Sequence, residues 1–109
     1  MSTVIDIVQP FVRRGLFPST EKAVAEMAQD YVLHQIERYR AVDDQLRAKY
    51  GMTYDQFDAY LKSRAATLAA APDVTLNQAV MLEEEDAQDW HIAREMLNSW
   101  LGLQGEVTA

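Results

Sequence analysis

Residues 20–50 contain neither glycine nor proline, and their apolar side chains recur at steps of three and four residues. This spacing is typical of a helix that buries one face. The apolar stripe consists of Val24, Ala28, Tyr31, Val32, Ile36, Tyr39, Val42, Leu46 and Tyr50. At about 1.5 Å per residue the helix from Thr20 to Tyr50 would measure about 45 Å, whereas a compact chain of this size has a radius of gyration of about 13 Å. We therefore expect one end of this helix to project or to be covered by another chain.

The long segment is bounded by residues that stop and start helices. Gly51 is suited to end it, and Gly15 is suited to end the apolar segment before it, because glycine adopts the left-handed conformation common after a last helical turn. Ser19 can cap the first turn of the long helix, where Glu21 is favoured by the helix dipole. Leu16 and Phe17 are expected to pack over this joint. The pattern predicts a module of helix, five-residue joint and long helix.

The first segment is predicted to be helical from about Ile7 to Arg14. Asp6 followed by Gln9 resembles a capping pair, and Pro10 is tolerated only in the first turn of a helix. The β-branched residues before it also favour a strand. Residues 2–5 therefore remain open between a helix and a short extended arm.

Two further helices are predicted from T-x-x-Q capping boxes, in which a threonine begins a helix and a glutamine three residues later completes the cap. The first begins at Thr53 and ends before Pro72. The second begins at Thr75 and runs to about Leu101, with Gly102 and Gly105 as stops. The expected apolar positions are Tyr54, Phe57, Leu61, Ala65, Leu68, Val80, Leu82, Trp90, Ala93, Leu97, Trp100 and Leu101.

We thus expect an all-α fold of about four helices, two of them long, in an elongated bundle that forms an interwoven homodimer. Residues 1–109 are interpreted as one domain. It contains a helix–joint–helix module over residues 1–51, an acidic helical pair over residues 52–103 and a tail over residues 104–109. An apolar content of 49% with 25% charged residues is typical of a globular protein.

The absence of cysteine excludes disulfides and thiolate chemistry. No apolar run approaches the roughly 18 residues that span a bilayer. The first residues lack a basic start followed by an apolar signal core. From these features we expect a cytoplasmic protein that does not enter a membrane.

The net charge of −7 lies entirely in the second half of the chain. Residues 1–50 carry 7 acidic and 7 basic side chains, which cancel, whereas residues 51–109 carry 10 acidic and 3 basic ones. Nucleic-acid binding depends on Lys and Arg that neutralise phosphates, so this half is a poor DNA-binding surface. It is better suited to a basic protein partner, although an acidic surface that only aids solubility is the simpler interpretation.

The residues 83–91 are the strongest candidate for a metal site. Hard cations bind clustered carboxylates, and this segment contains Glu83, Glu84, Glu85, Asp86, Asp89 and His91. Four consecutive carboxylates point around a helix rather than toward one ion, and the Glu-x-x-His spacing of helical di-iron sites is missing. A solvated acidic face is therefore favoured over metal binding.

Enzymatic activity has weak support from the sequence. The helical pyrophosphohydrolases of the MazG type use two carboxylate motifs, and only Glu83 with Asp86 matches one of them partially. No glycine-rich phosphate loop or nucleophile motif occurs. We expect no catalytic residue, no metal and no cofactor.

Association surfaces are predicted instead. Tryptophan is enriched at binding hot spots, and Trp90 and Trp100 lie near one helical face, although core packing is the simpler interpretation of both. The predicted partner-binding residues are Glu83, Glu84, Glu85, Asp86, Asp89, Trp90 and Trp100. The predicted dimer interface consists of Tyr31, Ile36, Tyr39 and Leu46.

Residues 7–24 resemble the helix–joint–helix of ribbon-helix-helix antitoxins, in which a first helix ends in glycine, an aromatic residue follows, and a serine caps a helix opening with Glu and Ala-Val. The remainder, including residues 49–57 and 83–90, looks like small bacterial proteins, some cyanobacterial, that are grouped with the antitoxin components of toxin–antitoxin systems. The family's DNA contacts come from a β-ribbon before the first helix. In this chain the ribbon is absent or reduced to Ser2–Ile5, without a basic residue.

The resemblance implies a role in holding a partner protein. Our leading hypothesis is a non-enzymatic, antitoxin-like protein that dimerises and binds a basic, toxin-like partner through its acidic C-terminal helices. The alternatives are a DNA-binding regulator of ribbon-helix-helix type and a helical metal-dependent hydrolase.

Overall fold

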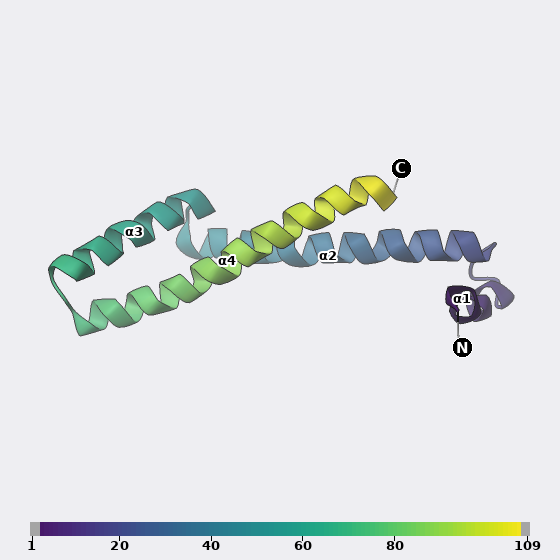
Figure 1. The fold of residues 1–109 in the computed structure, drawn as a ribbon, viewed down its shortest axis with the longest axis horizontal. Helices are drawn as coiled ribbons and strands as arrows, with labels where there is room; N and C mark the ends of the chain where they lie inside the picture. The colour runs from purple at the N-terminus through teal and green to yellow at the C-terminus, as the bar shows by residue number, and fades with distance from the viewer. Residues whose placement is uncertain (1–2, 108–109) are drawn as a thin grey trace. The chain divides into compact units, whose positions relative to one another are not determined.

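The computed structural model describes residues 3–107 and contains four helices (Figure 1). They are α1 (Val4–Arg13), α2 (Thr20–Tyr50), α3 (Tyr54–Ala70) and α4 (Val74–Val107). No strand occurs between residues 3 and 107, which confirms the predicted all-α class with two long helices. The chain forms two compact units. The terminal unit comprises Met1–Ile36 and Ser99–Ala109, and the central unit comprises Glu37–Asn98.

Helix α1 begins earlier than the sequence predicts. Thr3 is its N-cap: the Thr3 hydroxyl accepts from the Asp6 amide, and the Asp6 carboxylate accepts from the Thr3 amide, each at 3.2 Å. This reciprocal pair satisfies two donors that a helix start leaves free, so the predicted start near Ile7 with an Asp6–Gln9 pair is wrong. Pro10 consequently lies inside the helix, where it supplies no amide donor. Residues 4 and 5 are helical, and Ser2 lies outside the described residues.

The joint between α1 and α2 confirms the predicted stop and start. Gly15 has a φ of 75°, and its amide donates to Val12 while the Leu16 amide donates to Phe11, each at 3.0 Å. This pair of bonds is the Schellman arrangement that satisfies the last carbonyls of a helix. The Ser19 hydroxyl accepts from the Lys22 amide at 3.1 Å and caps α2.

The packing expected of Leu16 and Phe17 is only half right. Phe17 is half-buried, and its ring meets the Phe11 ring edge-on with centroids 6.4 Å apart. Leu16 is 64% exposed, so it does not pack over the joint. The Schellman turn satisfies the backbone by itself, and the joint therefore does not require a second apolar side chain to close it.

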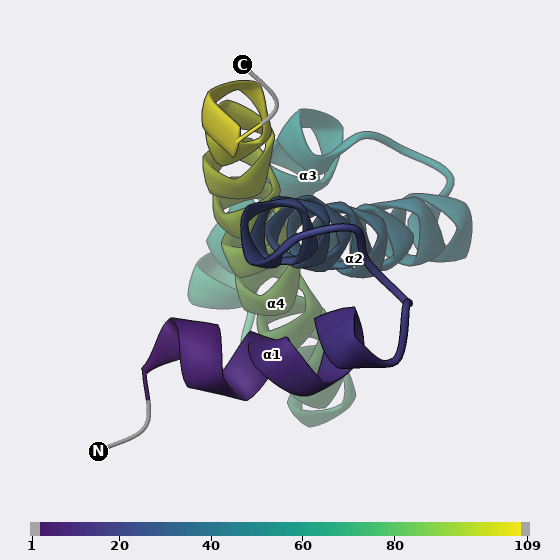
Figure 2. The ribbon, with the colours of Figure 1, turned by 90° about the vertical axis from the view of Figure 1, so that its right-hand side faces the viewer.

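Helix α2 has the predicted bounds, and Gly51 ends it with a φ of 65°. In the terminal unit, α1 lies across the first turns of α2 (Figure 2), and the buried residues are Val8, Ala23, Val32 and Ile36. The end of α4 belongs to this unit and contacts α2. The Trp100 and Tyr31 rings meet edge-on with centroids 5.7 Å apart, and Gln29 donates to the Val107 carbonyl at 3.1 Å. A small set of side chains thus forms the core of this unit.

Helix α3 begins with the predicted Thr53–Gln56 capping box and ends before Pro72. Helix α4 departs from the prediction at both ends. Its start is bonded to Asp73, whose carboxylate accepts from the Leu76 amide at 2.9 Å, so the cap lies two residues before Thr75.

At its far end α4 continues past Gly102 and Gly105 to Val107, so residues 102–107 are helical and the predicted glycine stops are wrong. An interior glycine costs a helix only about 1 kcal/mol, and the Gln29 side chain bonds one of the last carbonyls of α4. Of the predicted tail over residues 104–109, only residues 108–109 lie outside the residues that the structure describes.

The central unit has an aromatic core. Leu46, Phe57, Leu61 and Trp90 are buried together, and partly buried residues surround them: Val42, Tyr50, Met52, Tyr54 and Ala87. Phe57 stacks on Tyr50 with ring centroids 4.1 Å apart. Helix α3 and the first half of α4 run side by side in opposite directions (Figure 1). This hairpin closes on the end of α2 through the shared core and positions the side chains described next.

Candidate functional site

The inward carboxylates of α4 are bound by residues of the central unit. The Asp86 carboxylate accepts from the Lys49 ammonium at 2.6 Å and from the Tyr50 hydroxyl, through the same oxygen. The Lys49 bond, then the Tyr50 bond, hold the pKa of Asp86 below its ordinary value, against the effect of its partial burial. Burial, followed by the bond to Asp86, raises the pKa of Tyr50. At neutral pH Asp86 is therefore ionised, and the Lys49 ammonium balances its negative charge.

Glu83 is neutralised in the same way from α3. The Arg64 guanidinium donates to Glu83 at 2.9 Å, and the two side chains are only 25% and 16% exposed. Arg64 Nε and Glu83 Oε2 are buried without hydrogen-bond partners of their own among the described residues. Arg64 also lies over the Tyr60 ring, 5.2 Å from its centroid. The ion pair ties α3 to α4 but leaves one donor and one acceptor unused.

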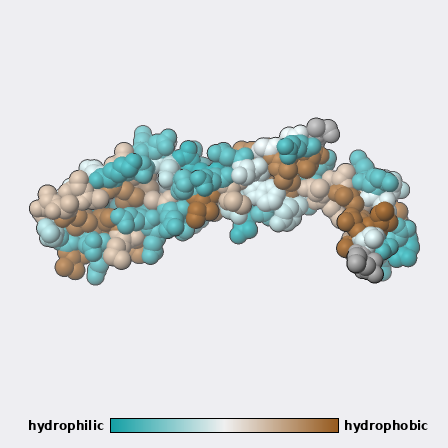
Figure 3. All heavy atoms as spheres, viewed as in Figure 1, coloured by the Kyte–Doolittle hydropathy of each residue, from teal (hydrophilic) through white to brown (hydrophobic). Residues whose placement is uncertain are grey.

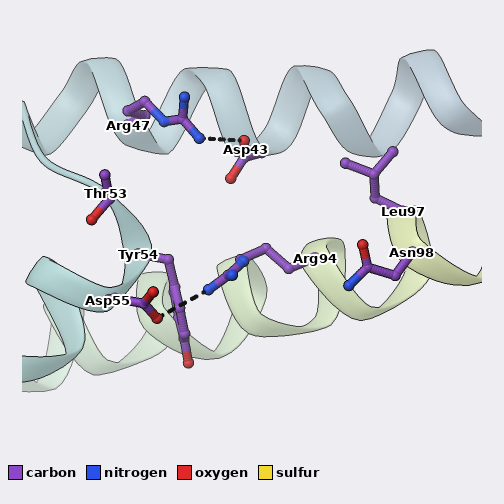
Figure 4. A pocket seen from close by; sticks show the side chains of 8 residues that line it. All are labelled: Asp43, Arg47, Thr53, Tyr54, Asp55, Arg94, Leu97 and Asn98. Atoms are coloured by element: carbon purple, nitrogen blue, oxygen red, sulfur yellow. Dashed lines mark hydrogen bonds and ion pairs between the residues drawn. The ribbon is translucent and has the colours of Figure 1, made fainter. Parts of the chain in front are cut away.

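A polar hollow of about 150 Å³ lies where α2, the start of α3 and α4 meet (Figure 4). Its cations and carboxylates bind one another. Arg47 donates to Asp43 at 3.1 Å, and Arg94 approaches Asp55 at 3.5 Å while lying over the Tyr54 ring. The indole of Trp90 donates to the other oxygen of Asp43 at 2.7 Å. Because its charges are matched, the hollow offers no feature that selects an anion or a cation.

The predicted metal suspects do not converge. Among the described residues, no three His, Asp or Glu side chains are grouped where they could hold one ion. Glu83 and Asp86 lie in separate ion pairs. His91 lies 3.0 Å from Glu95, one turn along the same helix. Each of these side chains has a neighbour in the chain that accounts for it without a metal.

The remaining carboxylates of the acidic run are turned away from the core around Trp90, and one of them, Asp89, lines a groove between α2 and α4. Glu84, Glu85 and Asp89 are exposed, and none makes an ion pair or hydrogen bond within the part of the chain that the structure describes. Met81 and Leu82, at 56% and 65% exposure, lie one turn before Glu84 and Glu85. We call these five residues the outer face of α4. They combine uncompensated negative charge with exposed apolar surface.

A second surface is the α2–α4 groove, an open hollow of about 410 Å³ in the central unit. Its lining residues are Tyr39, Val42, Gln45, Leu46, Lys49, Asp86, Asp89, Ile92 and Ala93. They come only from α2 and α4, and no α3 residue contributes. In bundles of four helices such a groove is filled by another helix, so this side of the central unit is open to a further element.

The structure distributes the predicted association residues over different environments. Trp90 is fully buried in the central core, and Trp100 is half-buried beside Tyr31 in the terminal unit. The indole nitrogen of Trp100 is buried without a hydrogen-bond partner among the described residues. Of the predicted partner-binding set, Glu84, Glu85 and Asp89 are exposed, and Asp89 also lines the α2–α4 groove.

Of the predicted dimer residues, Ile36 and Leu46 are buried, whereas Tyr39 is half-buried in the α2–α4 groove and Tyr31 is 59% exposed. Lys49, Arg64 and Asp43 could not be predicted as partners of α4, because nothing in the order of residues marks pairs that lie 19 to 47 positions apart. Counting helical turns from Trp90 would have separated inward from outward carboxylates.

Searches of protein-family models, of curated proteins and of solved structures find no match to this chain. The resemblance to antitoxins therefore remains a prediction. Within residues 3–107, none of the helices combines the length and the apolar character that crossing a membrane requires.

The Tyr50–Asp86 pair predicts how stability depends on pH. The folded pKa of Asp86 is lowered, so its stabilisation is present above its unfolded pKa and is lost as acid protonates it. The folded pKa of Tyr50 is raised above its ordinary value of 10.0, so its stabilisation is present below pH 10.0 and is lost as the pH rises beyond it. We expect Tyr50→Phe to flatten the alkaline decline in the free energy of unfolding, measured by urea titration followed by circular dichroism at about pH 8 and pH 11.

Tyr60→Phe is the matched control, because the Tyr60 side chain is 36% exposed and its hydroxyl makes no hydrogen bond among the described residues. An alkaline decline that is the same in wild type and Tyr50→Phe would contradict a stabilising phenol–carboxylate bond.

Proposed function

We propose that this chain is a non-enzymatic, antitoxin-like interaction protein that forms homodimers and binds a basic partner protein through the outer face of α4. The observation that carries the proposal is the sorting of charge on this helix. Glu83 and Asp86 are neutralised within the chain, whereas Glu84, Glu85 and Asp89 are exposed and uncompensated. Opposite charge across an interface favours encounter and specificity.

The apolar residues of the outer face support a protein partner over a purely solvating role. Met81 and Leu82 are more than half exposed beside the free carboxylates. An apolar patch bordered by charge is typical of protein interfaces. A partner with basic side chains around an apolar knob would match both features.

Self-association is supported by the terminal unit. Its exposed large apolar side chains outnumber its buried ones, and they are Val4, Ile5, Ile7, Phe11, Leu16, Val24, Tyr31, Leu33, Leu101 and Leu103. Monomeric proteins rarely leave such surface uncovered. We do not put forward the DNA-binding or hydrolase alternatives, because no described feature favours either over association.

The proposal is tested by capturing partners from the native host with the tagged full-length protein. The charge-reversed variant Glu84→Lys/Glu85→Lys/Asp89→Lys should lose, by about tenfold or more, a basic protein that wild type retains in stoichiometric amount. Three reversed contacts of about 0.5–1 kcal/mol each account for a loss of that size. Mass spectrometry of the eluted proteins gives the measurement.

A matched control reverses three exposed acidic residues elsewhere, Glu26, Glu37 and Asp44. The control should retain the partner. Equal loss of the partner in both variants would show that binding depends only on the net charge of the protein. The absence of any stoichiometric basic partner would refute the proposal.

A further inference from the structure

Helix α1 carries an apolar surface that the chain covers only along its centre. Val8 is 3% exposed, whereas Val4, Ile5 and Ile7 are 60–63% exposed and Phe11 is 39% exposed. At 100° per residue these side chains occupy an arc of about 160°. Figure 3 shows hydrophobic atoms gathered over this helix. Val4, Ile7 and Phe11 lie on one side of Val8, and we call them the α1 edge.

The α2–α4 groove matches the α1 edge in chemistry. Its apolar lining consists of Tyr39, Val42, Leu46, Ile92 and Ala93, and Ile92 is 48% exposed although it lines the groove. An exposed isoleucine beside a half-open apolar groove is a surface that a helix could cover by ordinary side-chain packing.

The two surfaces also match in length. The α2 side of the groove extends from Tyr39 to Lys49, which at about 1.5 Å per residue corresponds to about 15 Å of helix. Helix α1 has 10 residues and the same length. Helix α1 would therefore span the groove without overhang, and the α1 edge from Val4 to Phe11 would cover about 10 Å of it.

Charge favours this pairing as well. Arg14 is the C-cap of α1, three residues after Phe11 of the α1 edge, and it is exposed without an ion pair among the described residues. Asp89 lies on the rim of the groove and is equally uncompensated. Bringing the two surfaces together would pair these charges, whereas packing two α1 edges on each other would leave both groove and Asp89 uncovered.

We infer that the α1 edge of one copy of this chain docks in the α2–α4 groove of a second copy, and that the second copy returns the same contact. The exchange gives a closed dimer with two equivalent interfaces, as two-fold symmetry requires. Val8 stays buried within its own chain throughout. This inference rests on the self-association in the proposed function and specifies its surfaces.

The chain contains no cysteine, so introduced cysteines report contacts without background. Ile7→Cys and Ile92→Cys are prepared as separate full-length proteins, mixed in equal amounts and treated with a short bis-maleimide linker, which tolerates small errors in register. We expect the mixture to give a cross-linked two-chain species in at least fivefold excess over either variant alone, measured by denaturing electrophoresis and mass spectrometry.

The control mixes Ile7→Cys with Val74→Cys, whose side chain is exposed at the start of α4 outside the groove. It should give only the background yield. Adding Arg14→Glu to the Ile7→Cys chain should lower the yield, and adding Asp89→Arg to the Ile92→Cys chain should restore it. Circular dichroism confirms that each variant keeps its helical content.

The outcomes distinguish a failure of the proposed exchange from a failure of the proposed self-association. Efficient cross-linking of Ile7→Cys with itself, or of Ile92→Cys with itself, would replace the exchange with a different dimer and overturn the inference. A dimer by light scattering without the mixed product would also overturn it while leaving self-association intact. A monomer by light scattering would refute both.

Discussion

Replacing Trp90 with alanine is expected to lower the free energy of unfolding by about 3–5 kcal/mol, the range for removing a large buried aromatic side chain. Trp90 is 0% exposed, and its ring packs against Tyr54 and Phe57 with centroids 5.6 Å away in both cases. Its removal also deprives Asp43 of the indole donor. Equilibrium unfolding in urea, followed by circular dichroism, measures the loss.

The control for this prediction is Leu82→Ala on the same helix. Leu82 is 65% exposed, so its removal is expected to change stability by no more than about 0.5 kcal/mol. If Trp90→Ala cost as little as Leu82→Ala, the central core would not depend on this indole, and the account of the central unit would be wrong.

The second large effect is expected at Arg64. Arg64→Met would leave the Glu83 carboxylate without its cation in a site where only 16% of that side chain is exposed. Removing one partner of a fully buried ion pair costs about 3–5 kcal/mol, and because this pair keeps some contact with solvent we expect a loss of about 2 kcal/mol. The same urea titration provides the measurement.

The double variant Arg64→Met/Glu83→Met separates the loss of a charge partner from the loss of packing. Replacing both members of a buried pair with apolar residues of similar size is often neutral or stabilising. The double variant should therefore recover most of the stability that Arg64→Met loses. Further destabilisation in the double variant would show instead that Glu83 stabilises the fold by contacts other than its ion pair.

The helix–joint–helix module and α3 could be predicted from sequence because their ends depend on hydrogen bonds among neighbours. Gly15, Ser19 and Thr53 each bond or bend the backbone within four residues, so residue type and spacing are sufficient. The predicted start of α1 is wrong because Asp6 belongs to a capping pair with Thr3 and not with Gln9. Thr3 forms a reciprocal pair with Asp6, and this outweighs the cost of leaving Pro10 inside the helix.

The far end of α4 could not be predicted in this way. Gly102 and Gly105 are weak helix formers in isolation, but a side chain 78 positions earlier, Gln29, bonds the carbonyl of Val107. A contact between segments so far apart in the chain overrides local propensity. The same reason explains why the Lys49 and Arg64 partners of α4 emerged only from the fold.

The position of the buried Trp90 divides the acidic run of α4 into inward and outward members. Glu83 and Asp86 lie seven and four residues before the buried Trp90, which places them on the inward face of α4. Glu84 and Glu85 lie between these positions and point outward. The run was correctly expected to point around the helix, but which members remain free for a partner depends on which neighbouring helices supply cations.

Multi-angle light scattering of the full-length protein at micromolar concentration tests the central claim, self-association through the terminal unit, most directly. Wild type is expected to have a mass of twice 12.4 kDa. The variant Ile7→Asp, which places a charge in the α1 edge, should return to the mass of one chain while keeping its helical content. A wild-type protein that elutes as a single chain of 12.4 kDa under these conditions would contradict the claim.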